Sequence, residues 1–214
     1  MKVVSLKAEN ARKAGAVRAE FSDGSSLLFT GEYLPDWISD PDYWETGREL
    51  SSGEEEALRF AASCYRAETH ALRLIARAEQ NSLGLTVKLE RRGHDAAAVN
   101  AVISCLRNRK LLDDRRYAQL WIRSRLSAKK AFSPKGLLVS LGKRGIRRDD
   151  SLNALGATLD PETEYALLLR YLERDNRKNS GISEKKRKKF LKSKIKYEGF
   201  SSSVLEKYFN DQID

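Results

Sequence analysis

The chain has 214 residues, 40 Lys and Arg against 30 Asp and Glu, and a net charge of +10. This length can bury a sizeable core, either in one large domain or in an array of small units. No apolar run approaches the ~18–20 residues of a transmembrane helix, the start lacks a signal-peptide pattern, and two cysteines cannot form a disulfide framework. We expect a soluble, cytoplasmic protein whose positive charge favours a polyanion or an acidic protein surface as partner.

The first 30 residues predict a small β meander. Val and Phe recur with partial alternation near 2–8 and 15–22, and a further apolar run lies near 25–31. Asp23-Gly24 separates the second and third runs, and Asp-Gly between β-type runs is a hairpin signal. We therefore expect three strands at these positions.

A connector over 33–53 follows the predicted strands. It contains Trp37 and Trp44, and we expect both rings to pack as apolar anchors. From Glu54 onward apolar residues recur at helical spacing, and the serines just before Glu54 are a typical helix start. The rest of the chain therefore reads as helical.

Three glycines mark an internal repeat. Gly93, Gly145 and Gly199 are spaced by 52 and 54 residues. Apolar residues stand eight and four positions before each glycine and ten positions after it: Leu85, Leu89 and Ile103; Leu137, Leu141 and Leu155; Leu191, Ile195 and Phe209. The two preceding positions share one helix face, and a glycine beyond that face is the expected left-handed helix stop.

The repeat predicts the fold class and the domain boundaries. The expected fold is mainly α, a tandem array of three three-helix repeats that stack to complete one another's cores. A small N-terminal β hairpin or meander precedes them. The expected boundaries are 1–53 for the β segment and connector, 54–112 for repeat 1, 113–160 for repeat 2 and 161–214 for repeat 3.

Positive charge is concentrated in the middle repeat. Residues 105–148 carry 14 basic and 2 acidic side chains, a net charge of +12 that exceeds the total for the chain. A surface that only keeps the protein soluble would intersperse positive and negative side chains, so this excess of positive charge indicates a basic binding face. The candidate contact residues are Arg115, Arg116, Arg123, Arg125, Lys129, Lys130, Lys135, Lys143, Arg144, Arg147 and Arg148. We expect Arg116, Arg123, Lys143 and Arg144 to form one outward face.

Several segments of the chain resemble the RecX family of regulatory proteins. Leu111-Leu-Asp-Asp-Arg-Arg-Tyr-Ala118 matches the family's junction between its first two repeats. The stretch from Ser133 to Ile146 resembles the second repeat, and Tyr197-Glu-Gly-Phe-Ser201 the third. The resemblance covers roughly 55–210. The chain departs from the family pattern at Gly84 and Glu198, and in a 174–189 loop that looks longer than usual and contains the Lys185–Lys189 run.

The resemblance implies a function and a set of partners. It implies a non-enzymatic modulator of the RecA recombinase, which lies in the groove of the RecA–single-stranded DNA filament as a monomer. Such a protein inhibits strand exchange, ATP hydrolysis and filament growth, and so acts in DNA repair, homologous recombination and the SOS response. Independently of the family, the basic face favours a general DNA- or RNA-binding helical protein, which stays the alternative reading.

Candidate catalytic sites in the sequence are weak. Asp113 and Asp114 are adjacent and precede a helix, so Asp113 is expected to be an N-cap rather than an acid or base. The Gly136 to Gly142-Lys143 segment differs from a phosphate-binding loop in its spacing and lacks the final Ser or Thr. We therefore expect no catalytic residues.

The histidines and cysteines do not predict a metal site. His70 and His94, with Cys64 and Cys105, lack the spacing of zinc ligands. Both cysteines fall on expected helices, where core packing is the ordinary role. We expect neither a bound metal nor a cofactor.

Overall fold

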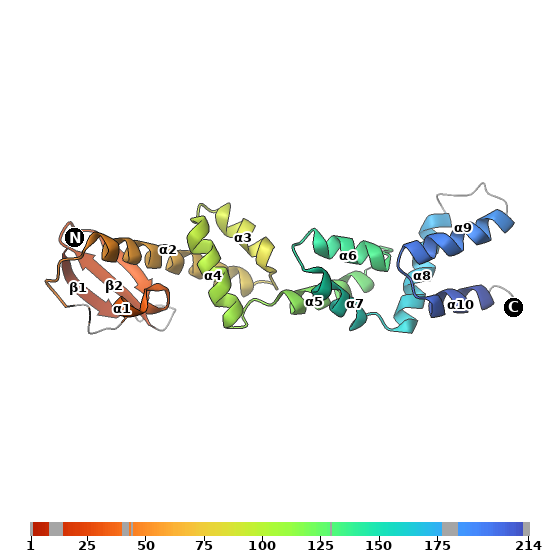
Figure 1. The fold of residues 1–214 in the computed structure, drawn as a ribbon, viewed down its shortest axis with the longest axis horizontal. Coiled ribbons are helices and arrows are strands. Elements are labelled where there is room, and N and C mark those ends of the chain that lie inside the picture. The colour runs from red at the N-terminus through yellow and green to blue at the C-terminus, as the bar shows by residue number, and fades with distance from the viewer. Residues whose placement is uncertain are drawn as a thin grey trace. The chain divides into compact units, whose positions relative to one another are not determined.

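The computed structural model describes residues 2–8, 15–39, 43, 45–128, 130–176 and 184–211, without the side chains of 175–176 and 184–189. The chain divides into two compact units, Met1–Leu112 (unit 1) and Asp113–Asp214 (unit 2), and each is described by itself (Figure 1). None of the helices in this described part has both the length and the apolar character needed to span a bilayer.

Unit 1 opens with the predicted meander. The strands β1 (Val3–Ala8), β2 (Ala16–Phe21) and β3 (Ser26–Thr30) form an antiparallel sheet in the order β1-β2-β3. The turn between β2 and β3 is closed by the Asp23 carboxylate, which accepts a hydrogen bond from the backbone N–H of Ser25 at 2.9 Å. The three strands predicted from the sequence are confirmed.

The remaining regular elements in the described part of unit 1 are helices, and the longest of them contacts both the sheet and the later helices. The elements are η1 (Gly31–Tyr33), α1 (Asp36–Ser39), α2 (Ser52–Ile75), α3 (Ser82–Glu90) and α4 (Ala96–Asn108). Helix α2 contacts β3 near its start and α3 and α4 further along (Figure 1). Leu58 of α2 is buried with Phe29 of the sheet, and Ala67 with Leu89 of α3. Tyr33 packs against both groups, so the core of unit 1 is continuous.

The connector differs from the sequence prediction at one tryptophan. Trp37 is 58% exposed and meets the ring of Tyr43 edge-on, with ring centroids 6.1 Å apart. Trp37, expected to pack as an apolar anchor, thus packs on Tyr43 at the surface and is not buried. Trp44 lies outside the described residues.

The start of α2 is fixed by a buried carboxylate. Ser51 and Glu54 form a capping box, in which each side chain accepts a hydrogen bond from the other residue's backbone N–H. Tyr43 and Arg48 also donate to the Glu54 carboxylate. The hydrogen bond from Tyr43, then that from the Ser51 backbone, lower the pKa of Glu54 from its ordinary 4.5 to about 2.

We expect the Glu54→Gln variant to lose stability in a pH-dependent way. Because the folded pKa of Glu54 is lowered, its contribution is complete above about pH 4.5 and is lost as the pH falls toward 2. At pH 7 the variant should lose about 1–2 kcal/mol of unfolding free energy. Urea unfolding from pH 7 to 3 checks this, and the gap between variant and parent should narrow as the pH falls. Parallel profiles would contradict the role assigned to Glu54.

The regular elements in the described part of unit 2 are all helices. Its elements are α5 (Asp114–Leu126), α6 (Pro134–Gly142), α7 (Arg148–Gly156), α8 (Pro161–Asn176), α9 (Glu184–Tyr197) and α10 (Ser202–Asn210). Helix α7 contacts α5 and α6, and α10 contacts α8 and α9 (Figure 1). One apolar cluster joins both groups and contains Ile122, Leu141, Leu168 and Ile195.

The 174–189 segment is shorter as a loop than the sequence predicted. Helix α8 continues to Asn176, and α9 begins at Glu184, so the Lys185–Lys189 run belongs to a helix. The side chains of that run and residues 177–183 lie outside the described part of the structure.

The three aligned glycines end three helices in the same way. Gly93, Gly145 and Gly199 have φ of 79°, 76° and 86°. At Gly145 the backbone N–H donates to the Gly142 carbonyl, and the N–H of Ile146 donates to that of Leu141, which is a Schellman motif. The same pair of bonds occurs at Gly93 and at Gly199. The predicted left-handed helix stop at Gly145 is confirmed.

Candidate partner-binding surface

The basic residues singled out from the sequence lie on α5, on α6 and in the turns around α6 and α7. Helix α5 carries Arg115, Arg116, Arg123 and Arg125, and α6 carries Lys135. Lys143 and Arg144 follow α6, Arg147 is the N-cap of α7 and Arg148 is its first residue. Asp113 accepts hydrogen bonds from the N–H groups of Arg115 and Arg116, which confirms it as the N-cap of α5. Lys130 follows α5, and Lys129 lies outside the described residues.

Two of these cations share one carboxylate within the unit. The buried carboxylate of Asp150 accepts from Nε of Arg115 at 2.5 Å and from Nε of Arg147 at 2.8 Å. Burial alone would raise the pKa of Asp150, but the bonds from Arg115 and Arg147 outweigh it and hold that pKa below its ordinary range. Arg115 therefore ties α5 to α7, and Arg147 pairs with Asp150 within the first turn of α7. The single carboxylate offsets one of the two positive charges, so the group keeps a net charge of +1.

We expect Asp150→Asn to destabilise unit 2 while leaving its charged exterior in place. The amide keeps the size of the side chain but removes the charge that accepts two guanidinium hydrogen bonds, which should cost about 1–3 kcal/mol of unfolding free energy. Denaturant unfolding at pH 7 measures the loss. Asp149→Asn is the matched control, since Asp149 is exposed on the same turn and should shift stability by at most about 0.5 kcal/mol. Equal effects of both variants would contradict the pairing.

A second group of cations surrounds the half-buried ring of Trp121. The guanidinium carbon of Arg144 lies 4.6 Å from the ring centroid and that of Arg125 lies 5.0 Å from it. Arg144 also donates to the carbonyl of Ser140 at 2.7 Å, and Phe132 meets Trp121 edge-on at 6.5 Å. These contacts are cation–π stacking, which orients each guanidinium. Arg144, which we expected on one outward face with Arg116, Arg123 and Lys143, is thus half-buried on Trp121.

Two lysines also lie on aromatic rings. The ammonium of Lys135 is 3.3 Å from the ring centroid of Tyr197 on α9, and that of Lys130 is 5.5 Å from the ring of Phe132. Tyr197 is 69% exposed, so the pair of Lys135 and Tyr197 lies at the surface. A basic side chain beside an exposed aromatic face can meet both an anion and a flat base or ring.

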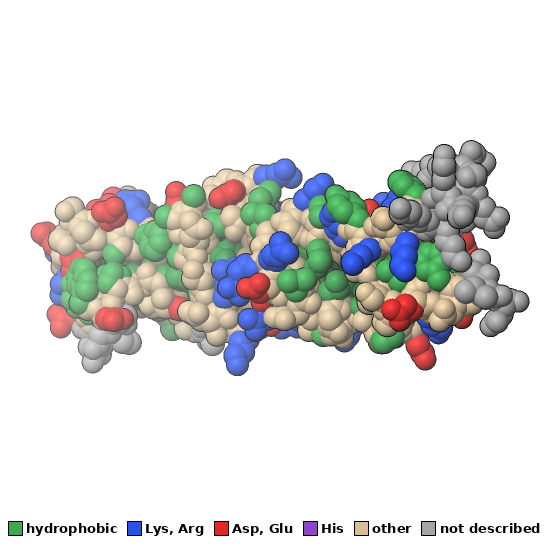
Figure 2. Space-filling model, turned by 45° about the vertical axis from the view of Figure 1, so that its right-hand side comes forward, with side chains coloured by type: hydrophobic (Ala, Val, Ile, Leu, Met, Phe, Trp, Pro, Cys, Tyr) green, Lys and Arg blue, Asp and Glu red, His purple; other side chains and the backbone are tan. Residues whose placement is uncertain are grey.

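Four further cations of the predicted face are exposed at the surface of unit 2. We call Arg116, Arg123, Lys143 and Arg148 the exposed basic set. Figure 2 shows, on the face in view, that Lys and Arg side chains form small groups separated by hydrophobic and neutral surface. The high charge of the middle segment thus does not form one continuous basic layer on that face.

Two arginines of α8 were missed in the sequence. Arg170 donates to the carbonyls of Leu126 and Ala128 at 3.0 and 3.1 Å, and Arg174 donates to that of Ala131 at 2.7 Å. They hold the segment that follows α5 and leads to Lys130. Their spacing of four residues places them on one helix face, but nothing in the sequence indicates which carbonyls that face would meet.

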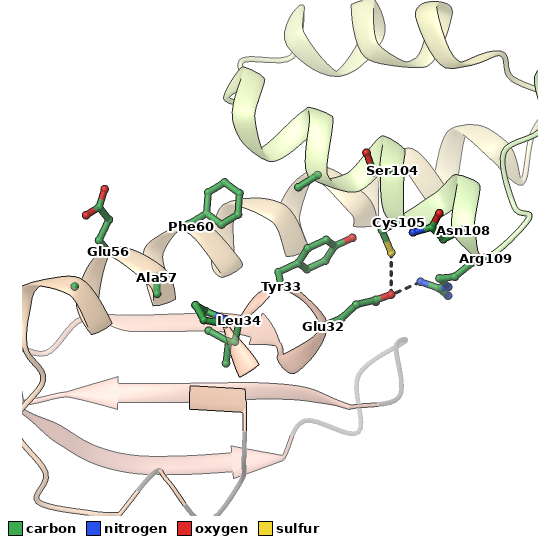
Figure 3. A pocket seen from close by; sticks show the side chains of 13 residues that line it. Glu32, Tyr33, Leu34, Glu56, Ala57, Phe60, Ser104, Cys105, Asn108 and Arg109 are labelled. Atoms are coloured by element: carbon green, nitrogen blue, oxygen red, sulfur yellow. Dashed lines mark hydrogen bonds and ion pairs between the residues drawn. The ribbon is translucent and has the colours of Figure 1, made fainter. Parts of the chain in front are cut away.

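Unit 1 contains a pocket that the sequence did not indicate. A cavity of about 740 Å³ lies among η1, the start of α2 and the end of α4. Leu34 and Phe60 supply apolar walls, and Figure 3 shows Glu32 reaching toward Cys105 and Arg109 at the polar edge. Phe60 is 37% exposed, so the apolar wall is open to solvent.

The polar edge of this pocket is an internally satisfied network. A carboxylate oxygen of Glu32, one of Glu68 and Sγ of Cys105, which are the atoms that could ligate a metal ion, lie within 4.8 Å of one another. Arg109 pairs with Glu68 at 2.7 Å and with Glu32 at 3.6 Å, and the hydroxyl of Tyr33 donates to Glu68. The guanidinium of Arg109 thus occupies the place beside the two carboxylates where a metal cation would otherwise bind. Burial raises the pKa of Cys105, and its thiol donates to Glu32, so both effects disfavour the reactive thiolate. Cys105 is half-buried here, not in the core as expected.

Comparison with known proteins places the chain in a family. No family model matches it. It is 38% identical over 125 residues to "Regulatory protein RecX" of Treponema pallidum (strain Nichols), covering 58% of this chain and 76% of the relative. It is 40% identical over 76 residues to the protein of that name from Halorhodospira halophila (strain DSM 244 / SL1), covering 36% of this chain and 46% of the relative.

A solved structure shares the fold. "Crystal structure of regulatory protein RecX" superimposes with a TM-score of 0.70 at 20% identity, covering 96% of this chain and 97% of that one. This structural likeness shows a common fold, and the 38% identity to a relative covered over 76% of its length shows common ancestry. The chain therefore belongs to the RecX family of regulatory proteins.

Proposed function

We propose that this protein binds the RecA recombinase filament assembled on single-stranded DNA and inhibits its activity. Inhibition covers strand exchange, ATP hydrolysis and filament growth, and it acts through binding rather than through chemistry on a substrate. Membership of the RecX family carries this proposal. The site of action is the cytoplasm, where such filaments assemble, and the protein acts as a monomer.

The basic surface of unit 2 supports the proposal. A filament on single-stranded DNA presents phosphates and acidic side chains, which attract exposed cations over about 8 Å at physiological salt. The exposed basic set, Arg116, Arg123, Lys143 and Arg148, lies at the surface where such contacts can form. Arg125 and Arg144 are held on Trp121, so they lose less side-chain freedom when they meet an anion.

The proposal also concerns how the helices are organised. We infer three repeats of one three-helix plan, 54–112, 113–160 and 161–214, after the β segment and connector of 1–53. The shared Schellman motif at Gly93, Gly145 and Gly199 supports this inference. So do the buried residues four positions before each glycine, Leu89, Leu141 and Ile195. An array of repeats can present successive repeats to successive protomers of a filament.

ATP hydrolysis by a RecA–single-stranded DNA filament, titrated with this protein, tests the proposal. We expect hydrolysis to fall. Inhibition at far fewer molecules than RecA protomers indicates action on filament growth or ends, and inhibition near one per protomer indicates binding along the groove. Undiminished hydrolysis at equimolar protein would contradict the proposed function.

A general DNA- or RNA-binding protein is the second candidate. The pairing of Lys135 with the exposed ring of Tyr197 favours it, because aromatic faces stack on unpaired bases. Binding to naked single-stranded DNA, measured from 50 to 200 mM salt, separates the two functions. A steep fall in affinity with salt, together with unchanged RecA hydrolysis, would favour the second candidate.

A further inference from the structure

Unit 1 contains a basic hollow that the proposed function does not use. It measures about 400 Å³ and lies between α2 and the turn that joins α3 to α4. Helix α2 contributes Arg66, His70 and Arg73, which stand four and three residues apart and so share one helix face. The turn contributes Arg92 and His94 on either side of the helix stop at Gly93.

The hollow brings three arginine side chains around one space. Among the described residues, no carboxylate forms an ion pair with Arg66, Arg73 or Arg92, and no Asp or Glu lines the hollow. Asp95, which follows His94 in the chain, is turned to the start of α4, where it accepts from the N–H groups of Ala97 and Ala98. Three guanidinium groups around one hollow repel one another, and an anion between them would relieve that repulsion.

Two imidazoles complete the hollow and limit its charge. Nδ1 of His70 lies 2.7 Å from Nε2 of His94, and the ring centroids are 4.8 Å apart. A hydrogen bond between two ring nitrogens needs one donor and one acceptor, so both rings cannot be protonated while it persists. Burial, then the positive neighbours His70, Arg66 and Arg92, lower the pKa of His94. The positive neighbours of the hollow thus favour the neutral form of His94.

We propose that this hollow binds a phosphate group. Guanidinium groups match phosphate oxygens with paired N–H donors, and three of them converge here without carboxylates. A bound phosphate would favour protonation of the imidazole pair, so affinity should increase as the pH falls through the titration of the histidines. The group comes either as free phosphate or as a phosphodiester of single-stranded nucleic acid, and both sources present the same oxygens.

This proposal does not depend on the proposed function, since it rests only on residues of unit 1. The chain contains only two histidines, so imidazole NMR signals report on the hollow directly. The experiment records the apparent pKa values of the histidine pair in chloride, in inorganic phosphate and with a short single-stranded oligonucleotide, all at equal ionic strength. We expect an upward shift of about one pH unit with the anion that binds.

Matched variants identify the site. Arg92→Gln should abolish the phosphate-induced shift, and Arg73→Gln on the other element should do the same. Arg91→Gln is the control, because Arg91 is an equally exposed neighbour that does not line the hollow. The Arg92→Gln baseline should itself lie slightly higher, since Arg92 lowers the pKa of His94 in the parent.

The results distinguish the two sources of the phosphate group, and they also show whether the hollow binds phosphate at all. A shift with inorganic phosphate alone assigns free phosphate, and a shift with the oligonucleotide assigns the phosphodiester. Identical titrations in chloride, phosphate and oligonucleotide would overturn the proposal, as would a shift that Arg91→Gln loses as fully as Arg92→Gln. Failure of this experiment leaves inhibition of RecA hydrolysis unaffected, so the two proposals fail separately.

Discussion

Gly145→Val is expected to destabilise the protein by about 2–3 kcal/mol, because a β-branched residue is strained at positive φ. Gly145 has a φ of 76° and its N–H closes the end of α6 onto Gly142. The next residue, Ile146, donates to Leu141 and packs in the same apolar cluster. Relaxing the strain would thus break the turn that leads Ile146 into the core. Denaturant unfolding measures the loss.

A glycine three residues earlier supplies the control. Gly142 is helical, does not have positive φ, and has no atom within 4 Å of where a Cβ would stand. Gly142→Ala should therefore stabilise the protein by about 0.4–1 kcal/mol, since it restricts the unfolded chain. Opposite signs for the two variants support the helix-stop assignment. Unchanged stability of Gly145→Val would contradict it.

The features that the sequence predicted correctly are those set by local backbone geometry. Asp23-Gly24 predicted the hairpin, Asp113 the start of α5, and Gly145 the end of α6. In each case the signal and its physical cause lie within a few residues, because a cap or a turn is closed by its own neighbours. Such elements could be located without knowing what packs on them.

The candidate site was predicted less well, because charge counting treats each cation as independent. Arg115 and Asp150 stand 35 residues apart in the chain, yet they form an ion pair. The ring that holds Arg144 belongs to Trp121, on another helix. These partners depend on which helix faces meet, and helical spacing fixes the faces of one helix without fixing their neighbours. The sequence thus indicated the positively charged segment, but not which of its cations form ion pairs, stack on a ring or stay exposed.

The same reasoning explains what was missed in unit 1. His70 and His94 were judged only as metal ligands, and 23 residues lie between them, so their contact is a tertiary event. Glu68 lies on the buried side of α2, where an apolar residue is expected, and is held by Arg109 and Tyr33. A carboxylate at an apolar helical position is a usable signal for such a network.

Reversing the exposed basic set should abolish most of the effect on the recombinase. In the variant, Arg116, Arg123, Lys143 and Arg148 become Glu, which takes the 105–148 segment from +12 to +4. Arg144 is left unchanged because it stacks on Trp121. Exposed substitutions usually cost within about 0.5 kcal/mol each, so folding should survive. The protein concentration that gives half-maximal inhibition of RecA ATP hydrolysis should rise by roughly tenfold or more, because the attraction to the negatively charged filament becomes repulsion at these four positions.

The control for this reversal must change the net charge equally at other positions. Lys2, Arg91, Lys192 and Lys196 are exposed on unrelated elements, and reversing them to Glu also lowers the chain from +10 to +2. Both variants are compared at one fixed salt concentration, because screening changes the reach of every exposed charge. If the net charge alone steers association, the two variants weaken inhibition alike. If the exposed basic set makes the contacts, only the first does, and the difference shrinks as salt is added. A first variant that folds normally and inhibits as the parent does would show that these four cations are only a solvated surface.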